Sequence, residues 1–205
     1  MAIRGARRVT GALKTLGASI RRPSLLAGHK IKGLMGDDEL LALLTMASRV
    51  RSGSTILEIG VYLGKSTFYV EAGAQGQSIR HIVVDTFETG VAGGASEKRR
   101  EDFDANISRF REDVEVWEMD SSGLGAKLEA EGVCLDMAFI DGDHSYEMVK
   151  SDLEAVLSHS TPGAVICLHD FLKPCGVTRA AGEYLETKAI EPVRLVGSLL
   201  IARKT

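Results

Sequence analysis

Acidic and imidazole side chains stand at the ends of four apolar runs in this sequence. Glu58, Asp85, Asp141 and the pair His169–Asp170 each close a β-branched or apolar run that predicts a strand. If these strands run parallel, their carboxyl ends meet at one edge of a sheet, where ligands bind in open α/β folds. Because buried charge without a partner is costly, we expect some of these groups to meet a cation, a diol or a metal ion.

The stretch 55–67 must position the first of these acids. It reads Thr-Ile-Leu-Glu-Ile-Gly-Val-Tyr-Leu-Gly-Lys-Ser-Thr and predicts a strand, a loop bounded by Gly60 and Gly64, and a helix opened by Ser66. Glycine lets a ligand approach the backbone closely, and a helix start offers unpaired N–H groups to an anionic group. Strand, glycine turn and helix start together predict the nucleotide-binding half of a doubly wound fold.

The spacing of this turn discriminates between ligands. The phosphate loop of nucleotide hydrolases needs a glycine where Ile59 stands, and the dinucleotide fingerprint is broken by Tyr62 and Lys65. A carboxylate just before the first glycine suits the cationic amino group of a methionyl ligand and would repel a pyrophosphate. The remaining pattern, Glu-x-Gly-x-x-x-Gly, resembles motif I of the class I S-adenosylmethionine-dependent methyltransferases. The resemblance implies a cofactor site for S-adenosylmethionine that includes Glu58, Gly60, Tyr62, Gly64 and Ser66.

Two later acids extend this cofactor site. Asp85 follows the glycine turn at close to the ~20-residue spacing of the acid that binds ribose hydroxyls in dinucleotide folds. One carboxylate can accept from both hydroxyls of a diol. After the next predicted strand, the resemblance places Asp120 and Ser121 beside the adenine, and Asp141 also at the cofactor.

Strand and helix patterns alternate along residues 37–203, which predicts an α/β fold with a doubly wound parallel sheet. Gly197-Ser198 could turn a C-terminal hairpin. The resemblance implies a mostly parallel seven-stranded sheet with a C-terminal antiparallel hairpin and the last strand inserted, the Rossmann-like methyltransferase fold. The expected strands are 55–59, 81–85, 114–119, 134–141, 164–169, 192–196 and 199–202. The expected helices are 37–51, 65–73, 97–111, 124–131, 146–158 and 179–186.

The segment Phe-Ile-Asp-Gly-Asp-His-Ser-Tyr at 139–146, with Cys-Leu-His-Asp at 167–170, carries a narrower resemblance. Together with motif I it resembles a methyltransferase branch that includes macrolide-sugar O-methyltransferases and cephalosporin-hydroxylase-like proteins. The resemblance implies that Asp141 and Asp170 bind a divalent metal and that His144 is the general base. His169 stands where metal-dependent members often have an acid, and we expect it as a third ligand. Oxygen ligands favour Mg²⁺, whereas an imidazole favours Mn²⁺ or a softer ion.

Simpler roles compete for these residues. His144 could be a solvated residue at a helix start, Asp141 could touch only the cofactor, and His169 could be packed in the interior. Asp143 is best explained as the cap of the following helix. His81 carries no motif and is expected at the surface. At the level of function, the alternatives are a nucleotide-binding enzyme that uses Gly64-Lys65-Ser66 and a non-catalytic cofactor-binding module.

Charge is unevenly distributed: the net charge is −3, yet no acid precedes Asp37. Residues 1–35 therefore form a basic arm with apolar residues at helical spacing, and residues 36–205 form the cofactor-binding domain. The arm could lie on an anionic membrane surface or dock on the acidic body of its own or a neighbouring subunit. A glycine-rich loop at 86–96 could act as a lid.

Composition limits the cellular compartments and the binding partners that we expect for this protein. No apolar run approaches the roughly 20 residues that span a bilayer, and no secretory signal is apparent. The three cysteines are scattered, without disulfide or zinc spacing, which indicates a reducing cytoplasm. We expect a small-molecule or saccharide acceptor, a homo-oligomer and no nucleic-acid partner.

Overall fold

A computed structural model describes residues 25–88 and 96–205. In this part of the chain, seven strands form one sheet in the order β3-β2-β1-β4-β5-β7-β6. Strands β1 to β5 pair in parallel, and β7 inserts antiparallel between β5 and β6. The expected fold is thereby confirmed. The strands are β1 (Thr55–Ile59), β2 (Arg80–Asp85), β3 (Val114–Glu118), β4 (Leu135–Ile140), β5 (Ser160–Leu168), β6 (Ile190–Val196) and β7 (Leu199–Lys204).

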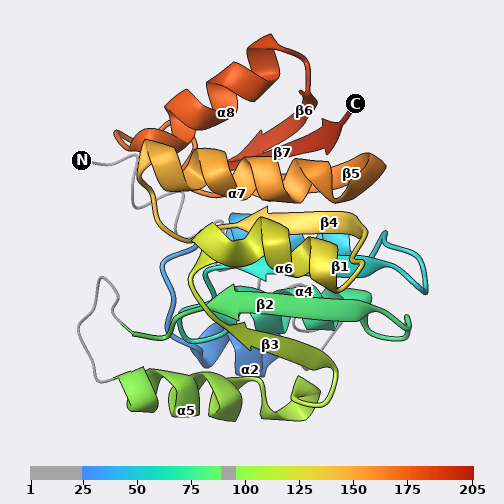
Figure 1. Cartoon of the computed structure of the whole chain (residues 1–205). Helices are drawn as coiled ribbons and strands as arrows, with labels where there is room; N and C mark the ends of the chain where they lie inside the picture. Colours follow the sequence, from blue (N-terminus) through green and yellow to red (C-terminus); the bar gives the residue numbers. More distant parts are fainter. Residues whose placement is uncertain (1–24, 89–95) are drawn as a thin grey trace, which may run out of the picture.

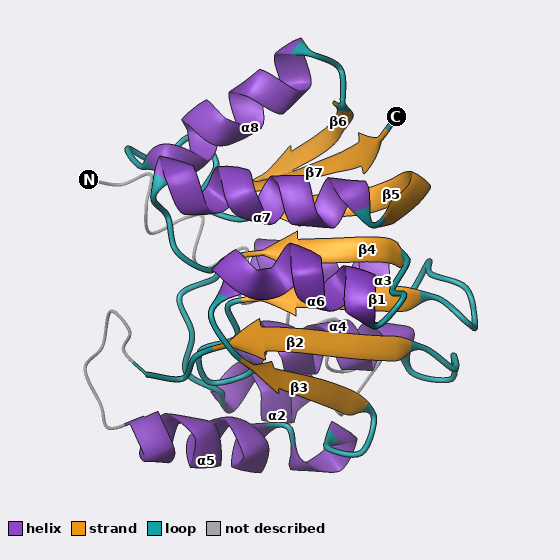
Figure 2. Cartoon of the chain, viewed as in Figure 1, coloured by secondary structure: helices purple, strands orange, loops and turns teal. Residues whose placement is uncertain are grey.

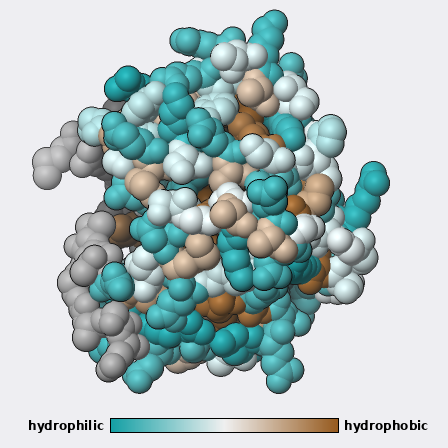
Figure 3. All heavy atoms as spheres, viewed as in Figure 1, coloured by the Kyte–Doolittle hydropathy of each residue, from teal (hydrophilic) through white to brown (hydrophobic). Residues whose placement is uncertain are grey.

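Helices cover both faces of the sheet (Figures 1 and 2). One face packs against α6, α7 and α8, and the other against α3, α4 and α5. The outer surface of α6, α7 and α8 is largely hydrophilic, with apolar side chains visible only in patches (Figure 3). The helices are α2 (Leu25–Lys30), α3 (Asp37–Ala47), α4 (Lys65–Ala74), α5 (Ser96–Asn106), α6 (Leu124–Ala130), α7 (Tyr146–Ser158) and α8 (Gly176–Glu186).

The central strands are apolar on both sides because helices cover them on both sides. In β4 every residue except Asp136 is buried, and alternate residues enter different clusters. Ala138 and Ile140 join the core beneath α6, α7 and α8, whereas Met137 and Phe139 join the core beneath α3 and α4. This packing fixes the register of the sheet and hence the positions of the strand ends.

Several bounds differ from the expected ones by one or two residues, and α3 ends at Ala47 instead of residue 51. Three further differences have a local structural reason. Pro162 and Gly163, expected in a turn before the fifth strand, lie inside β5, where the pairing with β4 is irregular and Gly163 has a φ of 79°. Helix α5 ends at Asn106 and is followed by a short 3₁₀ turn, Ser108–Phe110. Helix α8 begins at Gly176, three positions before the expected start, because its backbone is held against the loop that precedes α7.

Residues 25–35, which the sequence analysis assigned to the arm, pack against the domain. Leu25 and Ile31 are buried with Phe68 and Tyr69 of α4. The apolar and basic pattern of residues 1–24, and most of the proposed lid at 86–96, lie outside the described residues. Within the described ranges, no helix combines the length and the apolar character needed to cross a membrane.

Candidate active site

The carboxyl ends of β1 to β5 surround one cleft with a volume of about 930 Å³. In Figure 1 the arrowheads of β1, β2 and β4 point to this edge of the sheet. Two of the expected site residues, Glu58 and Gly64, do not line the cleft. The expected residues that do line it are Gly60, Tyr62, Ser66, Asp85, Asp120, Ser121, Asp141, His144, His169 and Asp170.

The site has two parts, which we call the glycine end and the histidine end. The glycine end is formed by Gly60, Tyr62 and Asp85 after β1 and β2. The histidine end is formed by Asp141 and His144 after β4 and by His169 and Asp170 after β5. The register β1–β4–β5 places the two ends side by side.

The two glycines of the turn have different reasons to be glycine. Gly60 has a φ of 82°, and a Cβ there would lie 2.3 Å from the carbonyl oxygen of Asp141. Its lack of a side chain therefore brings the two ends together. Gly64 has a φ of 81° and precedes α4, where a Cβ would clash with Ile107 and Phe103 of the neighbouring segment. Gly64 shapes the turn from beneath rather than facing the cleft.

The backbone holds Asp85 in place. Its Oδ2 accepts hydrogen bonds from the N–H groups of Val61 (2.9 Å) and Tyr62 (3.1 Å), and its Oδ1 accepts one from Phe87 (2.7 Å). Tyr62 and Phe87 have positive φ angles of 49° and 55°, which are uncommon for residues with side chains. These hydrogen bonds stabilise the unusual turns, and the turns fix the carboxylate.

Glu58 lies beneath the glycine turn with no exposed surface. Its Oε2 accepts a 2.7 Å hydrogen bond from Thr67 and lies 3.6 Å from Nε2 of His81. Burial raises the pKa of Glu58. Its Oε1 is buried and has no hydrogen-bond partner in the described part of the chain, but Glu58 does not line the cleft.

The expectation of a surface His81 is wrong. His81 is fully buried in β2, and its Nδ1 lies 2.7 Å from Oε1 of Glu71 on α4. The sequence showed an apolar strand with a polar residue at each end, but not that the crossover helix would provide a buried partner for His81. His81 thus lies between Glu58 and Glu71 beneath the cleft instead of facing solvent.

At the rim of the glycine end, Asp120 closes a tight turn after β3. Its Oδ1 accepts a 2.8 Å hydrogen bond from the N–H of Ser122. The bonds from Ser122 lower the pKa of Asp120. Asp120 and the adjacent Ser121 both line the cleft, where their oxygens can meet a polar ring.

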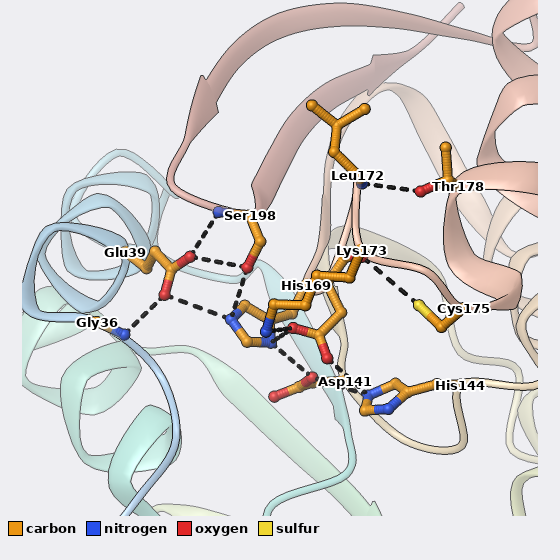
Figure 4. A network of polar contacts seen from close by, with 11 residues as sticks. Gly36, Glu39, Asp141, His144, His169, Leu172, Lys173, Cys175, Thr178 and Ser198 are labelled. Carbon is orange, nitrogen blue, oxygen red and sulfur yellow. Dashed lines mark hydrogen bonds and ion pairs between the residues drawn. The ribbon is translucent and has the colours of Figure 1, made fainter. Parts of the chain in front are cut away.

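At the histidine end, three side chains converge (Figure 4). Nε2 of His144 lies 3.5 Å from Oδ1 of Asp141 and 3.6 Å from Oδ2 of Asp170. The Asp141 carboxylate, with a contribution from Asp170, raises the pKa of His144 above its ordinary value. One donor atom from each residue lies within 4.8 Å of the others, a spacing that could hold a metal ion.

His169 lies one step behind this cluster, buried between carboxylates. Its Nδ1 lies 2.9 Å from Oδ1 of Asp141 and 3.1 Å from Oδ1 of Asp170, and its Nε2 lies 3.4 Å from Oε2 of Glu39. Burial alone would lower the pKa of His169, but the bonds to Asp141 and Glu39 outweigh burial and raise it to about 10. The side chains whose donor atoms lie within 4.8 Å of one another are Asp141, His144 and Asp170, and His169 lies behind them against the same two carboxylates.

Glu39 belongs to the site although no motif indicated it. It is buried in the first turn of α3, and accepts hydrogen bonds from the N–H groups of Gly36 and Ser198, both at 2.7 Å. Burial raises its pKa, but bonds from His169, Ser198 and Gly36 outweigh burial and lower it to about 2. In the sequence, Glu39 is only one of three acids in the first turn of the helix expected at 37–51. Figure 4 shows it linking α3, the β6–β7 turn and His169.

The loop that carries His144 is fixed from both sides. The N–H of Gly176 donates a 2.8 Å hydrogen bond to the carbonyl of His144, and a Cβ at Gly176 would lie 2.1 Å from the backbone nitrogen of Tyr146. The expected cap, Asp143, does not cap α7. Ser145 caps this helix, and Asp143 accepts a 2.6 Å bond from the N–H of Ser145.

Comparison with known proteins gives one family match. A family model described as "Methyltransferase domain" matches residues 57–171. This range contains the glycine turn, Asp85 and all four residues of the histidine end. No curated protein gives a significant match.

Solved structures share the fold at low sequence identity. The O-methyltransferase from Bacillus cereus in complex with SAH is 21% identical, with a TM-score of 0.63 and coverage of 94% of this chain and 91% of that chain. CalS11, described as a TDP-rhamnose 3′-O-methyltransferase, is 22% identical, with a TM-score of 0.60 and coverage of 80% and 78%. The O-methyltransferase NovP is 17% identical, with a TM-score of 0.60 and coverage of 83% and 81%.

Proposed function

Because the chain belongs to the methyltransferase domain family, we propose that it transfers the methyl group of S-adenosylmethionine to a hydroxyl oxygen of a small molecule or sugar. The observation that carries this proposal is the shared cleft, in which the glycine end and His144 lie side by side. A donor at the one end and an acceptor at the other would be held together, which accelerates transfer by removing the need for a random encounter.

The residues present fit the cofactor. In the proposed mode, Asp85 accepts from the ribose hydroxyls and Asp120 meets the adenine amino group. Oε1 of Glu58 does not line the cleft, so in the proposed mode it meets the methionyl ammonium through a water that enters beneath the glycine turn. Gly60 lines the cleft, and glycine lets a ligand approach the backbone closely. When bound, the cofactor supplies a methyl group activated by a positively charged sulfur.

His144 is proposed as the general base. Its Nε2 is buried without a hydrogen-bond partner in the described part of the chain, so it is available to accept a proton from an acceptor hydroxyl. Asp141 and Asp170 lie within 3.6 Å of this nitrogen and stabilise the imidazolium that forms. A positioned base of this kind typically contributes about 100- to 10,000-fold to the rate.

A divalent metal is a further element of the proposal. Asp141 and Asp170 would hold Mg²⁺ or Mn²⁺, with an imidazole from His144 or, as the sequence predicts, from His169. The metal would lower the pKa of the acceptor hydroxyl. If Nε2 of His144 binds the metal, that atom cannot also accept the proton, so the two roles exclude each other. Titration of the protein with Mn²⁺ tests for this site directly, with binding measured from the electron paramagnetic resonance signal of the ion.

The methyl acceptor and the partners are a further part of the proposal. CalS11 is described as acting on a TDP-rhamnose, which supports a saccharide or another small hydroxyl compound here. We propose a cytoplasmic homo-oligomer that binds no nucleic acid and whose basic arm contacts a membrane surface or another subunit.

Calorimetry with S-adenosylhomocysteine and with ATP tests the cofactor assignment. We expect the full chain to bind S-adenosylhomocysteine and not ATP; binding of ATP alone would instead favour a nucleotide-dependent enzyme. Incubation with S-adenosylmethionine and a panel of hydroxyl acceptors, including nucleotide-linked sugars, then tests catalysis. Cofactor binding without transfer to any acceptor in a broad panel would favour a non-catalytic binding module.

A further inference from the structure

The guanidinium of Arg99 is buried with unused hydrogen-bond donors. Arg99 lies in the first turn of α5 and is 9% exposed, and neither its Nε nor its Nη1 has a hydrogen-bond partner among residues 25–88 and 96–205. Its Nη2 lies 3.9 Å from Oδ1 of Asp85, which is too far for a hydrogen bond. Arginine stays charged and carries five N–H donors, so burying it without acceptors is costly. A ligand that provides acceptors would remove this cost.

The next residue shows the contrast. Nε of Arg100 donates to Asp104 at 3.1 Å and its Nη1 donates to Glu118 at 2.8 Å. Arg100 is therefore held by the protein itself, whereas Arg99 is not. The two arginines share a helix and differ in what their donors can reach.

Arg99 lies at the glycine end of the cleft. It lines the cleft together with Tyr62 and Asp85, and its guanidinium carbon is 5.5 Å from the centre of the Tyr62 ring. Asp85 already accepts three backbone hydrogen bonds, out of about four lone-pair sites on a carboxylate. Asp85 alone therefore has little capacity left for both hydroxyls of a ribose, while Arg99 beside it has donors to spare.

We propose that Arg99 is a cofactor-binding residue that donates hydrogen bonds to a ribose hydroxyl oxygen of the adenosyl group. In this arrangement the ribose hydroxyl donates a hydrogen bond to Asp85, and its oxygen accepts one from Arg99. The hydroxyl thus provides the acceptor that Arg99 lacks. The proposal rests on the proposed function and adds to it a residue from α5.

Calorimetry with S-adenosylhomocysteine tests the proposal on the full chain. Arg99→Met keeps the bulk of the side chain and removes the donors, and Arg100→Met is the matched control. We expect Arg99→Met to weaken binding roughly ten- to a hundredfold, as for hydrogen bonds from a charged group, and Arg100→Met to change it less than about twofold. Equal affinity of the wild type and Arg99→Met would overturn the proposal.

Analogues of S-adenosylhomocysteine that lack the 2′- or the 3′-hydroxyl locate the contact. For at least one analogue, the loss of affinity caused by Arg99→Met should be less than about threefold, because this analogue lacks the hydroxyl to which Arg99 would donate. An unchanged penalty for both analogues would overturn a ribose contact. Arg99-dependent binding of adenosine 2′-monophosphate that exceeds the binding of adenosine would also overturn it, in favour of a phosphate site.

Thermal unfolding without ligand separates binding from a structural role. Arg99→Met removes a 3.9 Å ion pair with Asp85, so the Tm should fall by less than ~4 °C; a larger fall would indicate a structural role and overturn the proposal. Failure of the wild type to bind S-adenosylhomocysteine would refute the proposed function and this inference together. Binding that Arg99→Met does not change would refute this inference alone.

Discussion

The glycine end and the histidine end both present carboxylates to the cleft, but they hold them differently. At the glycine end, backbone N–H groups hold the Asp85 carboxylate. At the histidine end, charged or ionisable side chains surround Asp141 and Asp170, namely His144, His169 and Lys173.

Because of this difference, the two ends should respond differently to side-chain substitutions. A carboxylate held by the backbone depends on the turns around it and is insensitive to most side-chain changes nearby. A carboxylate held by side chains depends on their protonation, and one substitution can remove its partner. We therefore expect the position of the Asp85 carboxylate to follow backbone geometry and catalysis to follow individual side chains at the histidine end, and the following changes test that separation.

The largest effect is expected from His144→Ala, which removes the proposed base. Methyl transfer should fall about 100- to 10,000-fold, while affinity for S-adenosylhomocysteine should stay within about twofold because the glycine end is untouched. The measurements are product formation with an acceptor found by screening and calorimetry with S-adenosylhomocysteine. His159→Ala, at the end of α7 and away from the cleft lining, is the control. Parallel loss of binding and transfer would contradict the separation of the two ends.

Gly60→Ala should damage both ends together. The added Cβ would lie 2.3 Å from the carbonyl of Asp141, at a residue whose φ is 82°. We expect the free energy of unfolding to fall by about 3 kcal/mol and cofactor binding to be lost. Gly76→Ala is the matched control, since Gly76 has a φ of 91° and nothing within 4 Å of an added Cβ.

The control should cost only the backbone strain, about 1 kcal/mol. Urea unfolding of both variants measures the difference, which isolates the clash. Equal losses for the two variants would show that Gly60 is needed only for its φ angle, and not for the contact between the ends.

Glu39→Gln should weaken the histidine end alone. The substitution removes the charge that faces His169 and disturbs the bonds from Gly36 and Ser198. We expect the free energy of unfolding to fall by about 2 kcal/mol, with little change in S-adenosylhomocysteine affinity. Glu147→Gln, an exposed acid in the first turn of α7, should change stability by less than about 0.5 kcal/mol. Equal losses of unfolding free energy in the two variants would show that the contacts of Glu39 with His169, Gly36 and Ser198 do not stabilise the protein.

The smallest effect is expected from pH, and its sign follows from two pKa shifts. The pKa of Glu39 is lowered from 4.5 to about 2, so its contribution is present above pH 4.5 and is lost as pH falls toward 2. The pKa of His169 is raised from 6.5 to about 10, so its contribution is present below pH 6.5 and is lost as pH rises toward 10.

The Tm difference between the wild type and Glu39→Gln should therefore be greatest between pH 4.5 and 6.5. Thermal unfolding of both proteins in a series of buffers measures this difference. A constant difference from acidic to alkaline pH would show that Glu39 contributes through its shape and not through its charge.

Local pattern was sufficient to predict most of the fold. The bounds of β1 and α7 agree with the expected 55–59 and 146–158, because both segments have a clear period and a clear end signal. The positions of Asp85, Asp141 and Asp170 followed from one rule, that parallel strands end at the same edge. The start of β5 was missed because a proline–glycine pair resembles a turn even where a strand irregularity absorbs it.

The residues missed or misplaced depend on contacts that sequence spacing does not reveal. The donor of Glu39 at Ser198 is 159 positions away, and the partner of His81 lies on a different element. Arg99 lies on a charged helix, where its neighbours Lys98 and Arg100 form ordinary i,i+4 pairs. No pattern in that helix distinguishes the buried Arg99 from its partly buried neighbour Arg100.

The contact of Glu39 with Ser198 also bears on the order in which the site can form during synthesis. A ribosome releases the chain from its N-terminal end, so α3 emerges long before β7, the last strand. Until the final hairpin has left the exit tunnel, Glu39 lacks its donors from Ser198. The contacts of Glu39 behind the histidine end are thus completed only after Ser198 has been released, and a nascent chain arrested before residue 198 carries the glycine turn without them.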